Sequence, residues 1–460
     1  MSFARINVVR LPTVIAVLML LSGGSPGAEP KRCVPVVASY ADVLERVAPA
    51  IVSVYTKSTP DLYLASASRS KSEEDELVSF GSGVLVDPAG LVATSSHGLR
   101  ADSPVKVALA DRREFDAEIV LVDRRTDLAV LRLKGAQGLA TVEIGDSDKV
   151  RIGDFVLAIG NPYGVGQTVT HGLVSAVGRT HLELSEYEYY IQTDAAMNPG
   201  SSGGALLDSR GLLIGINTAI VTQTRGWQGI GFAAPANMLS FVLAAARKGE
   251  KLIRRPWLGV KLTSLDASSA ARSGLKQHLG AVLKEVFADS PAARAGLQPG
   301  DILTSIDGRA IEDPSAFLYR FTMKGIYERA RLGVLRGGTE VVVEVAPGPA
   351  PEQPSRESTE MRTLSILQGA TIANLSPAVA EELGLDPEAV GVVVVEVEKD
   401  TMAQKFGFLR GDILLTANGV KIDSVRDAVR LLQNRRTTTL ELDRGGDIFS
   451  TRITRKPTRR

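Results

Sequence analysis

The most informative stretch of this chain is Thr193-Asp-Ala-Ala-Met-Asn-Pro-Gly-Ser-Ser-Gly-Gly-Ala205. It presents Ser202 on a glycine-rich turn, where backbone N–H groups are free to face a reacting carbonyl. A hydroxyl nucleophile needs such a turn, because hydrogen-bond donors must already surround the oxyanion that it creates. Gly200, Ser201 and Ser202 are the candidate donors. Taken alone, the stretch is more typical of a Gly/Ser surface turn, so the rest of the chain has to decide.

Two upstream segments supply the partners of a nucleophilic serine. Gly81 to His97 contains two short apolar strands around a Pro-Ala-Gly turn, and His97 follows the second strand. Asp127 stands just before an alternating strand, where a carboxylate can bind the Nδ1–H of an imidazole. A lone histidine is more often a packed residue, and such an aspartate more often forms a turn. Together, His97, Asp127 and Ser202 follow the chymotrypsin order of base, orienting carboxylate and nucleophile.

Longer segments around these residues carry a family resemblance. Gly160 to Arg179 is similar to the strand and loop before the nucleophile of the HtrA/Deg serine proteases, and Gly229 to Pro235 is similar to their pocket strand. The chain resembles this family, whose members are trypsin-like enzymes with appended PDZ domains. Two positions depart from the family pattern: Ser201 replaces a usual Asn, and Gly98 replaces a usual Val.

The first half of the chain is predicted to be mainly β. Short β-type runs are punctuated by Gly, Pro and Asp, as in an all-β barrel or sandwich. With the resemblance, this predicts a chymotrypsin-like double β-barrel with the triad in the cleft between the barrels. A short helix running into a strand is expected from Tyr40 to Lys57, and an amphipathic helix from Leu239 to Arg247.

The second half contains a duplicated unit. Val286 to Ile311 and Val397 to Ile422 align without gaps, and both contain Gly-Asp-Ile-Leu. Each unit reads as a strand, a short helix near Pro291 or Met402, the Gly-Asp turn, a second strand and a second helix. Repetition at this length indicates two separately folded domains. The pattern resembles PDZ domains, so two α/β PDZ domains are expected, with a Pro-rich linker from Ala346 to Pro354.

The PDZ resemblance also implies peptide-binding loops. In PDZ domains, a peptide adds as a strand and its C-terminal carboxylate is bound by backbone N–H groups. The matching loop of the first domain is Trp257, Leu258, Gly259 and Val260; an ordinary buried strand is the alternative. For the second domain, the candidate loop is Gly369 to Ile372, and ligand binding there is left open.

The trypsin-like resemblance also predicts the specificity pocket. In such enzymes the residue six before the nucleophile forms the base of the S1 pocket, and here that residue is Ala196. With Met197 beside it and Ile230 on the pocket strand, a small apolar pocket is expected to accept Val, Ala or Ile. A basic side chain would lack a counter-charge there.

The composition and the N-terminal sequence indicate which partners are expected and where in the cell the protein acts. Lys and Arg total 53 and Asp and Glu total 52, for a net charge of +1, and no basic run is interleaved with aromatics, which excludes a nucleic-acid partner. A basic start, the apolar run Leu11 to Leu21 and small residues up to Ala28 predict a signal peptide over 1–28, with an uncleaved anchor as the alternative. Cys33 is the only cysteine. An exported, disulfide-free chain fits a bacterial periplasm.

These observations combine into one functional hypothesis with one rival. The expected domains are the signal peptide 1–28, the protease domain 36–250 and the PDZ domains 256–347 and 361–456. The resemblance implies an ATP-independent endopeptidase that acts on unfolded or damaged proteins. It also implies that the PDZ domains bind peptide C-termini and that the chain forms homo-trimers or larger assemblies. No cofactor and no metal are expected. The rival is a chaperone or scaffold with little or no proteolysis.

Overall fold

The computed structural model describes residues 39–57, 78–99, 103–162, 166–220, 228–272, 279–363, 365–386, 389–433 and 437–454. The predicted signal peptide, Cys33 and the polar Pro60–Leu77 stretch lie outside these ranges. Within them, no helix is long and apolar enough to cross a membrane.

The first six strands close into a barrel. Its strand order is β1-β2-β3-β6-β5-β4, and every neighbouring pair runs antiparallel. The inward side chains are apolar and buried, which is why these alternating runs form a closed sheet. The elements are α1 (Ala41–Val47), η1 (Ala48–Ala50), β1 (Ile51–Lys57), β2 (Val78–Asp87), β3 (Leu91–Ser95), β4 (Val105–Ala108), β5 (Glu114–Asp123) and β6 (Leu128–Leu133).

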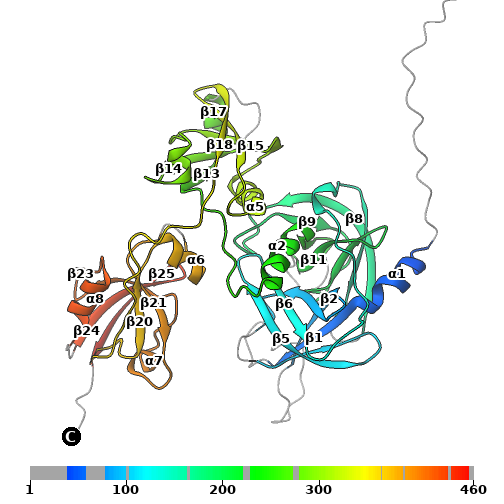
Figure 1. Cartoon of the computed structure of the whole chain (residues 1–460), viewed down its shortest axis with the longest axis horizontal. Coiled ribbons are helices and arrows are strands. Elements are labelled where there is room, and N and C mark those ends of the chain that lie inside the picture. The colour runs from blue at the N-terminus through cyan, green and yellow to red at the C-terminus, as the bar shows by residue number, and fades with distance from the viewer. Residues whose placement is uncertain are drawn as a thin grey trace, which may run out of the picture. The chain divides into compact units, whose positions relative to one another are not determined.

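The next six strands close into a second barrel with the order β10-β11-β12-β9-β8-β7. Figure 1 shows this barrel with α2 beside it. Helix α2 follows it and buries the apolar face that the sequence predicted. The double barrel and the mainly β class are therefore confirmed. The elements are η2 (Ser147–Lys149), β7 (Phe155–Gly160), β8 (Thr168–Arg179), β9 (Tyr190–Thr193), β10 (Ala205–Asp208), β11 (Leu213–Ile220), β12 (Gly231–Pro235) and α2 (Ala236–Arg247).

The first copy of the repeat folds as a sheet with the order β13-β14-β15-β17-β18, in which β16 also pairs with β15. The predicted short and long helices of this copy are α4 and α5. Its elements are β13 (Val260–Ser264), α3 (Ala267–Arg272), β14 (Ala281–Val286), α4 (Pro291–Arg294), β15 (Ile302–Ile306), β16 (Arg309–Ala310), α5 (Pro314–Lys324), β17 (Ala330–Arg336) and β18 (Thr339–Val345).

The second copy has the same core but one additional edge strand, giving the order β19-β20-β21-β22-β24-β25 with β23 on β22. Helices α7 and α8 correspond to α4 and α5. Its elements are β19 (Thr359–Glu360), β20 (Ala370–Asn374), α6 (Pro377–Leu383), β21 (Val392–Val397), α7 (Met402–Lys405), β22 (Ile413–Ala417), β23 (Val420–Lys421), α8 (Val425–Leu432), β24 (Thr437–Arg444) and β25 (Asp447–Thr454).

The Gly-Asp pair that marks both copies has a structural role. The carboxylate of Asp301 is 2% exposed and accepts two hydrogen bonds from the guanidinium of Arg336, at 2.7 and 2.6 Å. Asp412 is 0% exposed and binds Arg444 in the same way, at 2.6 and 2.7 Å. Such bidentate pairs are strong and directional. The repeated aspartate therefore fixes the last strand pair of each domain.

Replacing the arginine of this pair is expected to destabilise the second PDZ domain. Arg444→Met leaves the buried Asp412 carboxylate without its counter-ion, and we expect a loss of about 3 kcal/mol in the free energy of unfolding. Differential scanning calorimetry of the full chain measures it. Arg430→Met, which removes only an exposed pair with Asp427, is the matched control and costs at most about 1 kcal/mol. Equal effects of the two substitutions would contradict the structural role.

Candidate active site

His97 and Asp127 are brought together at one end of the first barrel. His97 follows β3, and its Nδ1 lies 2.8 Å from Oδ2 of Asp127. Asp127 stands in the turn before β6 with a φ of 56°. Its Oδ1 also accepts hydrogen bonds from the Ser96 N–H at 3.1 Å, the Ser96 hydroxyl at 3.0 Å and the His97 N–H at 2.9 Å. The carboxylate is thus fixed, and a carboxylate acceptor places the proton of the neutral imidazole on Nδ1.

The environment of His97 shifts its basicity. Burial lowers the pKa of the imidazole, but the hydrogen bond and the negative charge of Asp127 outweigh this effect, so the pKa of His97 is raised above the ordinary 6.5. The side chain remains 53% exposed, so the ring is accessible from solvent. A proton acceptor near neutrality is the property that a general base requires.

Ser202 lies on the loop between β9 and β10. Gly200 and Gly203 adopt φ values of 97° and 84°, which L side chains rarely take and which turn the backbone sharply around the serine. The Ser202 hydroxyl donates to the carbonyl of Thr218 at 3.0 Å. Among the described residues, no hydrogen bond joins it to His97. Ser202 or His97 must therefore move before the hydroxyl can donate to the imidazole.

Ser82 of strand β2 connects the nucleophile loop to the first barrel. Its buried hydroxyl donates to the carbonyl of Gly200 at 2.7 Å and accepts from the N–H of Asn161 at 2.8 Å. Its own N–H donates to the carbonyl of Ser202 at 2.8 Å. A Cβ on Gly203 would collide with the Ser82 carbonyl, so only glycine allows this approach. One residue of the first barrel thus holds both ends of the Gly200–Ser202 turn.

The structure narrows the set of predicted oxyanion donors. The N–H of Ser201 donates to the carbonyl of Asn198 at 2.9 Å and is not available to a ligand. In the described part of the chain, the N–H groups of Gly200 and Ser202 make no hydrogen bond. Two of the three predicted donors therefore remain, the N–H groups of Gly200 and Ser202.

The carbonyl of Gly98, the unusual residue after the histidine, accepts a hydrogen bond from the Thr56 hydroxyl at 3.2 Å.

The three residues predicted for the specificity pocket do not share one environment. Ala196 lines a cavity of about 20 Å³, together with Thr170 and Asn217, which has room for about one water molecule. Met197 is 3% exposed and packs into the core of the second barrel, so its side chain does not face a pocket. Ile230 is 37% exposed. The apolar specificity pocket at Ala196 therefore stays a prediction.

The loop predicted to bind peptides in the first copy of the repeat spans Trp257 to Val260. Trp257 pairs with Gly348 in an isolated bridge, and Gly259 has a φ of 77°. Leu258 is buried in the domain core, whereas Val260 begins the edge strand β13. The loop therefore leads directly into an edge to which a further strand can be added.

Sequence reasoning named the three candidate triad residues but not the residues that make hydrogen bonds around them. Ser82, Ser96 and Thr94 each make hydrogen bonds to the turn or to its supports; the Thr94 hydroxyl donates to the Ser82 carbonyl at 2.7 Å. The Gly81-Ser-Gly83 motif was a visible signal for Ser82, because small residues permit close backbone approach. Within the described residues, no cluster of three or more potential ligand side chains is arranged to hold a metal ion.

Comparisons with known proteins agree with this site. The family model described as a trypsin-like peptidase domain matches residues 81–216, and the PDZ domain model matches residues 282–319 and 393–444. The periplasmic pH-dependent serine endoprotease DegQ of Escherichia coli (strain K12) is 36% identical over 411 residues, which cover 86% of this chain and 86% of that protein. The periplasmic serine endoprotease DegP of Salmonella typhimurium is 35% identical over 376 residues, covering 81% and 76%.

A solved structure, the HtrA-type protease AlgW with a decapeptide, is 40% identical with a TM-score of 0.52, and the match covers 68% of this chain and 99% of that one. The matches to DegQ and DegP cover 86% and 81% of this chain, so the similarity extends well beyond the peptidase domain. The chain belongs to the HtrA family of serine endoproteases, with a trypsin-like peptidase domain followed by two PDZ domains.

Proposed function

We propose that this serine endopeptidase is exported to the periplasm and degrades unfolded or damaged proteins without ATP. The observation that carries the proposal is the His97–Asp127 hydrogen bond of 2.8 Å, together with a serine turn on which the N–H groups of Gly200 and Ser202 make no hydrogen bond to the described residues. In the proposed mechanism, the hydroxyl of Ser202 rotates from the Thr218 carbonyl to Nε2 of His97. His97 then accepts its proton as Oγ attacks a peptide carbonyl, and Asp127 stabilises the imidazolium.

The remaining steps use the same groups. The N–H groups of Gly200 and Ser202 stabilise the tetrahedral oxyanion, and His97 donates its proton to the leaving amine. The acyl-enzyme is hydrolysed by a water molecule that His97 activates in turn. No cofactor takes part. Aliphatic P1 side chains near Ala196 suit unfolded substrates, because such side chains are buried in native proteins.

The proposed organisation follows the predicted domains. A signal peptide over 1–28 precedes the protease domain 36–250, and the PDZ domains span 256–347 and 361–456. The periplasmic relatives support the location. The first PDZ domain binds peptide C-termini through Trp257 to Val260. The family supports homo-trimers or larger assemblies, for which analytical ultracentrifugation of the mature chain is the direct measurement.

One observation favours the rival function, a chaperone or scaffold without proteolysis. The Ser202 hydroxyl is hydrogen-bonded to Thr218 and not to His97 in this conformation. Labelling of Ser202 by a fluorophosphonate separates the two functions, because labelling requires an activated hydroxyl and a formed oxyanion hole.

Ser202→Ala is expected to abolish proteolysis and leave the fold intact. The substitution removes the nucleophile, which costs on the order of 10⁶ in kcat for comparable triads. Casein cleavage by the purified mature protein measures the loss. Ser201→Ala is the control on the same turn: it keeps the backbone N–H that binds Asn198 and should retain activity within about tenfold. Near-normal cleavage by Ser202→Ala would refute the triad.

Ser82→Ala is expected to lower kcat/KM about 10- to 100-fold, mainly through kcat. The hydroxyl holds the Gly200 carbonyl, so its loss lets the neighbouring oxyanion donors move, and a buried hydrogen bond of this kind is worth about 1–3 kcal/mol. Peptide hydrolysis with separate kcat and KM measures the effect. Thr94→Val removes a hydroxyl that binds the same strand but does not touch Gly200. If both variants lose kcat equally, Ser82 acts only through strand stability.

The pH dependence of hydrolysis is expected to report His97. The general base must be neutral, so activity falls as pH drops through its pKa, and this acid limb should lie above pH 6.5 because the pKa of His97 is raised. Asp127→Asn removes both raising effects and should move the limb to lower pH while reducing kcat. The profile of kcat/KM against pH tests this. A limb that stays at the same pH in Asp127→Asn argues against the assignment.

A further inference from the structure

The loops that precede β13 and β20 have the same backbone geometry. Gly259 and Gly369 have φ values of 77° and 84°. Their carbonyls accept equivalent hydrogen bonds, from the N–H of Phe287 in the first domain and from the N–H of Glu398 in the second, at 3.0 and 2.9 Å. The strand that follows each loop is therefore the equivalent peptide-docking edge of its domain.

The two docking edges differ in what lies against them. In the described part of the first domain, β13 pairs only with β14, and the N–H of Gly259 makes no hydrogen bond. In the second domain, β19 covers the edge: Thr359 stands opposite Ile372, in antiparallel register. The N–H of Gly369 donates to the carbonyl of Met361 at 3.0 Å. The second edge is thus occupied by the chain itself.

Met361 lies where a peptide's last residue would lie in a PDZ groove. Its N–H donates to the carbonyl of Ala370 at 2.8 Å, and its carbonyl oxygen accepts from the loop N–H of Gly369. Its side chain is 1% exposed and belongs to the core cluster that includes Ile372 of β20 and Val425 of α8. A carbonyl held by the loop and an apolar side chain buried between strand and helix are the two features of PDZ recognition.

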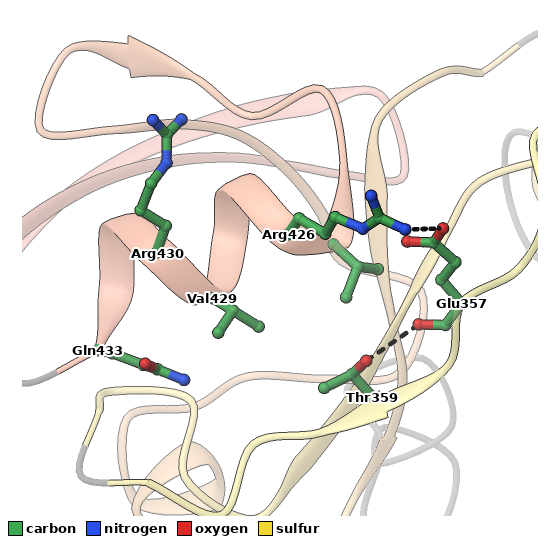
Figure 2. Close-up of a pocket in the computed structure, with 7 residues that line it drawn as sticks. Glu357, Thr359, Arg426, Val429, Arg430 and Gln433 are labelled. Atoms are coloured by element: carbon green, nitrogen blue, oxygen red, sulfur yellow. Dashed lines mark hydrogen bonds and ion pairs between the residues drawn. The ribbon is translucent and has the colours of Figure 1, made fainter.

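The residues before Met361 continue the pairing along β20. The carbonyls of Arg356 and Ser355 accept hydrogen bonds from the N–H and the side-chain amide of Asn374, both at 2.8 Å. Figure 2 shows Glu357 reaching from this segment to Arg426 of α8, at 3.1 Å, across the groove next to Val429. The segment thus contacts strand, loop and helix, as a bound peptide would.

We propose that the groove between β20 and α8 is a peptide site that the chain occupies in cis with residues 355–361. Met361 is the anchor residue, and Arg426 binds the carboxylate of Glu357. The site accepts competing peptides of the same chemistry, with an apolar anchor and an acidic residue opposite Arg426, only when residues 355–361 leave it. This rests on the proposed peptide binding by PDZ domains, and it makes the first domain the open site and the second a closed one.

The test uses the full chain with Ser202→Ala and a photo-reactive probe. The probe is the heptapeptide Ser-Arg-Glu-Ser-Thr-Glu followed by photo-methionine with a free carboxylate, and cross-links are mapped by mass spectrometry. Met361→Ser removes the anchor and should raise labelling of β20 and α8 at least about tenfold. Met361→Leu keeps an apolar anchor and should match the parent.

Two further variants keep the test independent of a folding defect. Glu357→Lys touches no buried group and should raise labelling about two- to fivefold, since an exposed ion pair is worth at most about 1 kcal/mol. The second variant carries Glu360→Cys and Thr371→Cys in a background with Met361→Ser and Cys33→Ser. Residues 360 and 371 face each other in β19 and β20, so a disulfide can join them. Oxidation should abolish the labelling of the second domain, and reduction should restore it.

The outcomes separate this inference from the proposed function. Equal labelling of α8 in the parent and in Met361→Ser, or no labelling of α8 in any variant, overturns the cis-ligand assignment. Labelling at Leu258 to Val260 reports the first domain and should be the same in all variants. Its absence would count against peptide binding by the first domain, while the contrast at α8 still decides the second.

Discussion

The junction between the two barrels is the constraint on which the catalytic geometry depends. His97 and Asp127 belong to the first barrel, whereas the Gly200–Ser202 turn belongs to the second. Ser82 joins them: its hydroxyl and N–H bind the carbonyls of Gly200 and Ser202, at 2.7 and 2.8 Å. Because Ser82 is buried and Gly200 and Ser202 are partly buried, breaking either hydrogen bond costs free energy. These two hydrogen bonds thereby fix the nucleophile turn of the second barrel against strand β2 of the first barrel.

The stability of the fold and catalysis favour opposite protonation states of His97. Its folded pKa is raised above 6.5, so the protonated form stabilises the fold; this contribution is present below the unfolded pKa and is lost as pH rises through the folded one. Catalysis requires the neutral form, which appears over the same rise in pH. The Asp127 carboxylate raises the pKa of His97, and in the proposed mechanism it also stabilises the imidazolium that forms when His97 accepts the proton of Ser202. The enzyme is therefore expected to be most active where this pair contributes least to stability.

The features predictable from sequence are those encoded within short segments. The triad, the duplicated unit and the helices of both copies depend on local motifs, and the structure has the barrels and helices where they were expected. Ser82 was missed because its role depends on partners far along the chain. Counting back from Ser202 gave Ala196 as the pocket base and Met197 as its neighbour, but the Met197 side chain packs in the core of the second barrel. Side-chain direction at a turn is set by tertiary packing, which a residue count does not contain.

The difference between the two PDZ domains shows why duplication of a motif does not imply duplication of function. Both copies keep the aspartate–arginine pair and the glycine that shapes the loop, so both form the same docking edge. What differs is the chain that enters each domain. At the first loop, Trp257 makes an isolated bridge to Gly348, and in the described part of the chain no strand pairs with the free edge of β13. Before the second loop, the chain supplies an apolar side chain at the distance that fills the groove, because Met361 lies one short loop ahead of Gly369. An intramolecular ligand has a high effective concentration. A dilute peptide can therefore bind the open groove of the first domain, whereas in the second domain it must compete with residues 355–361.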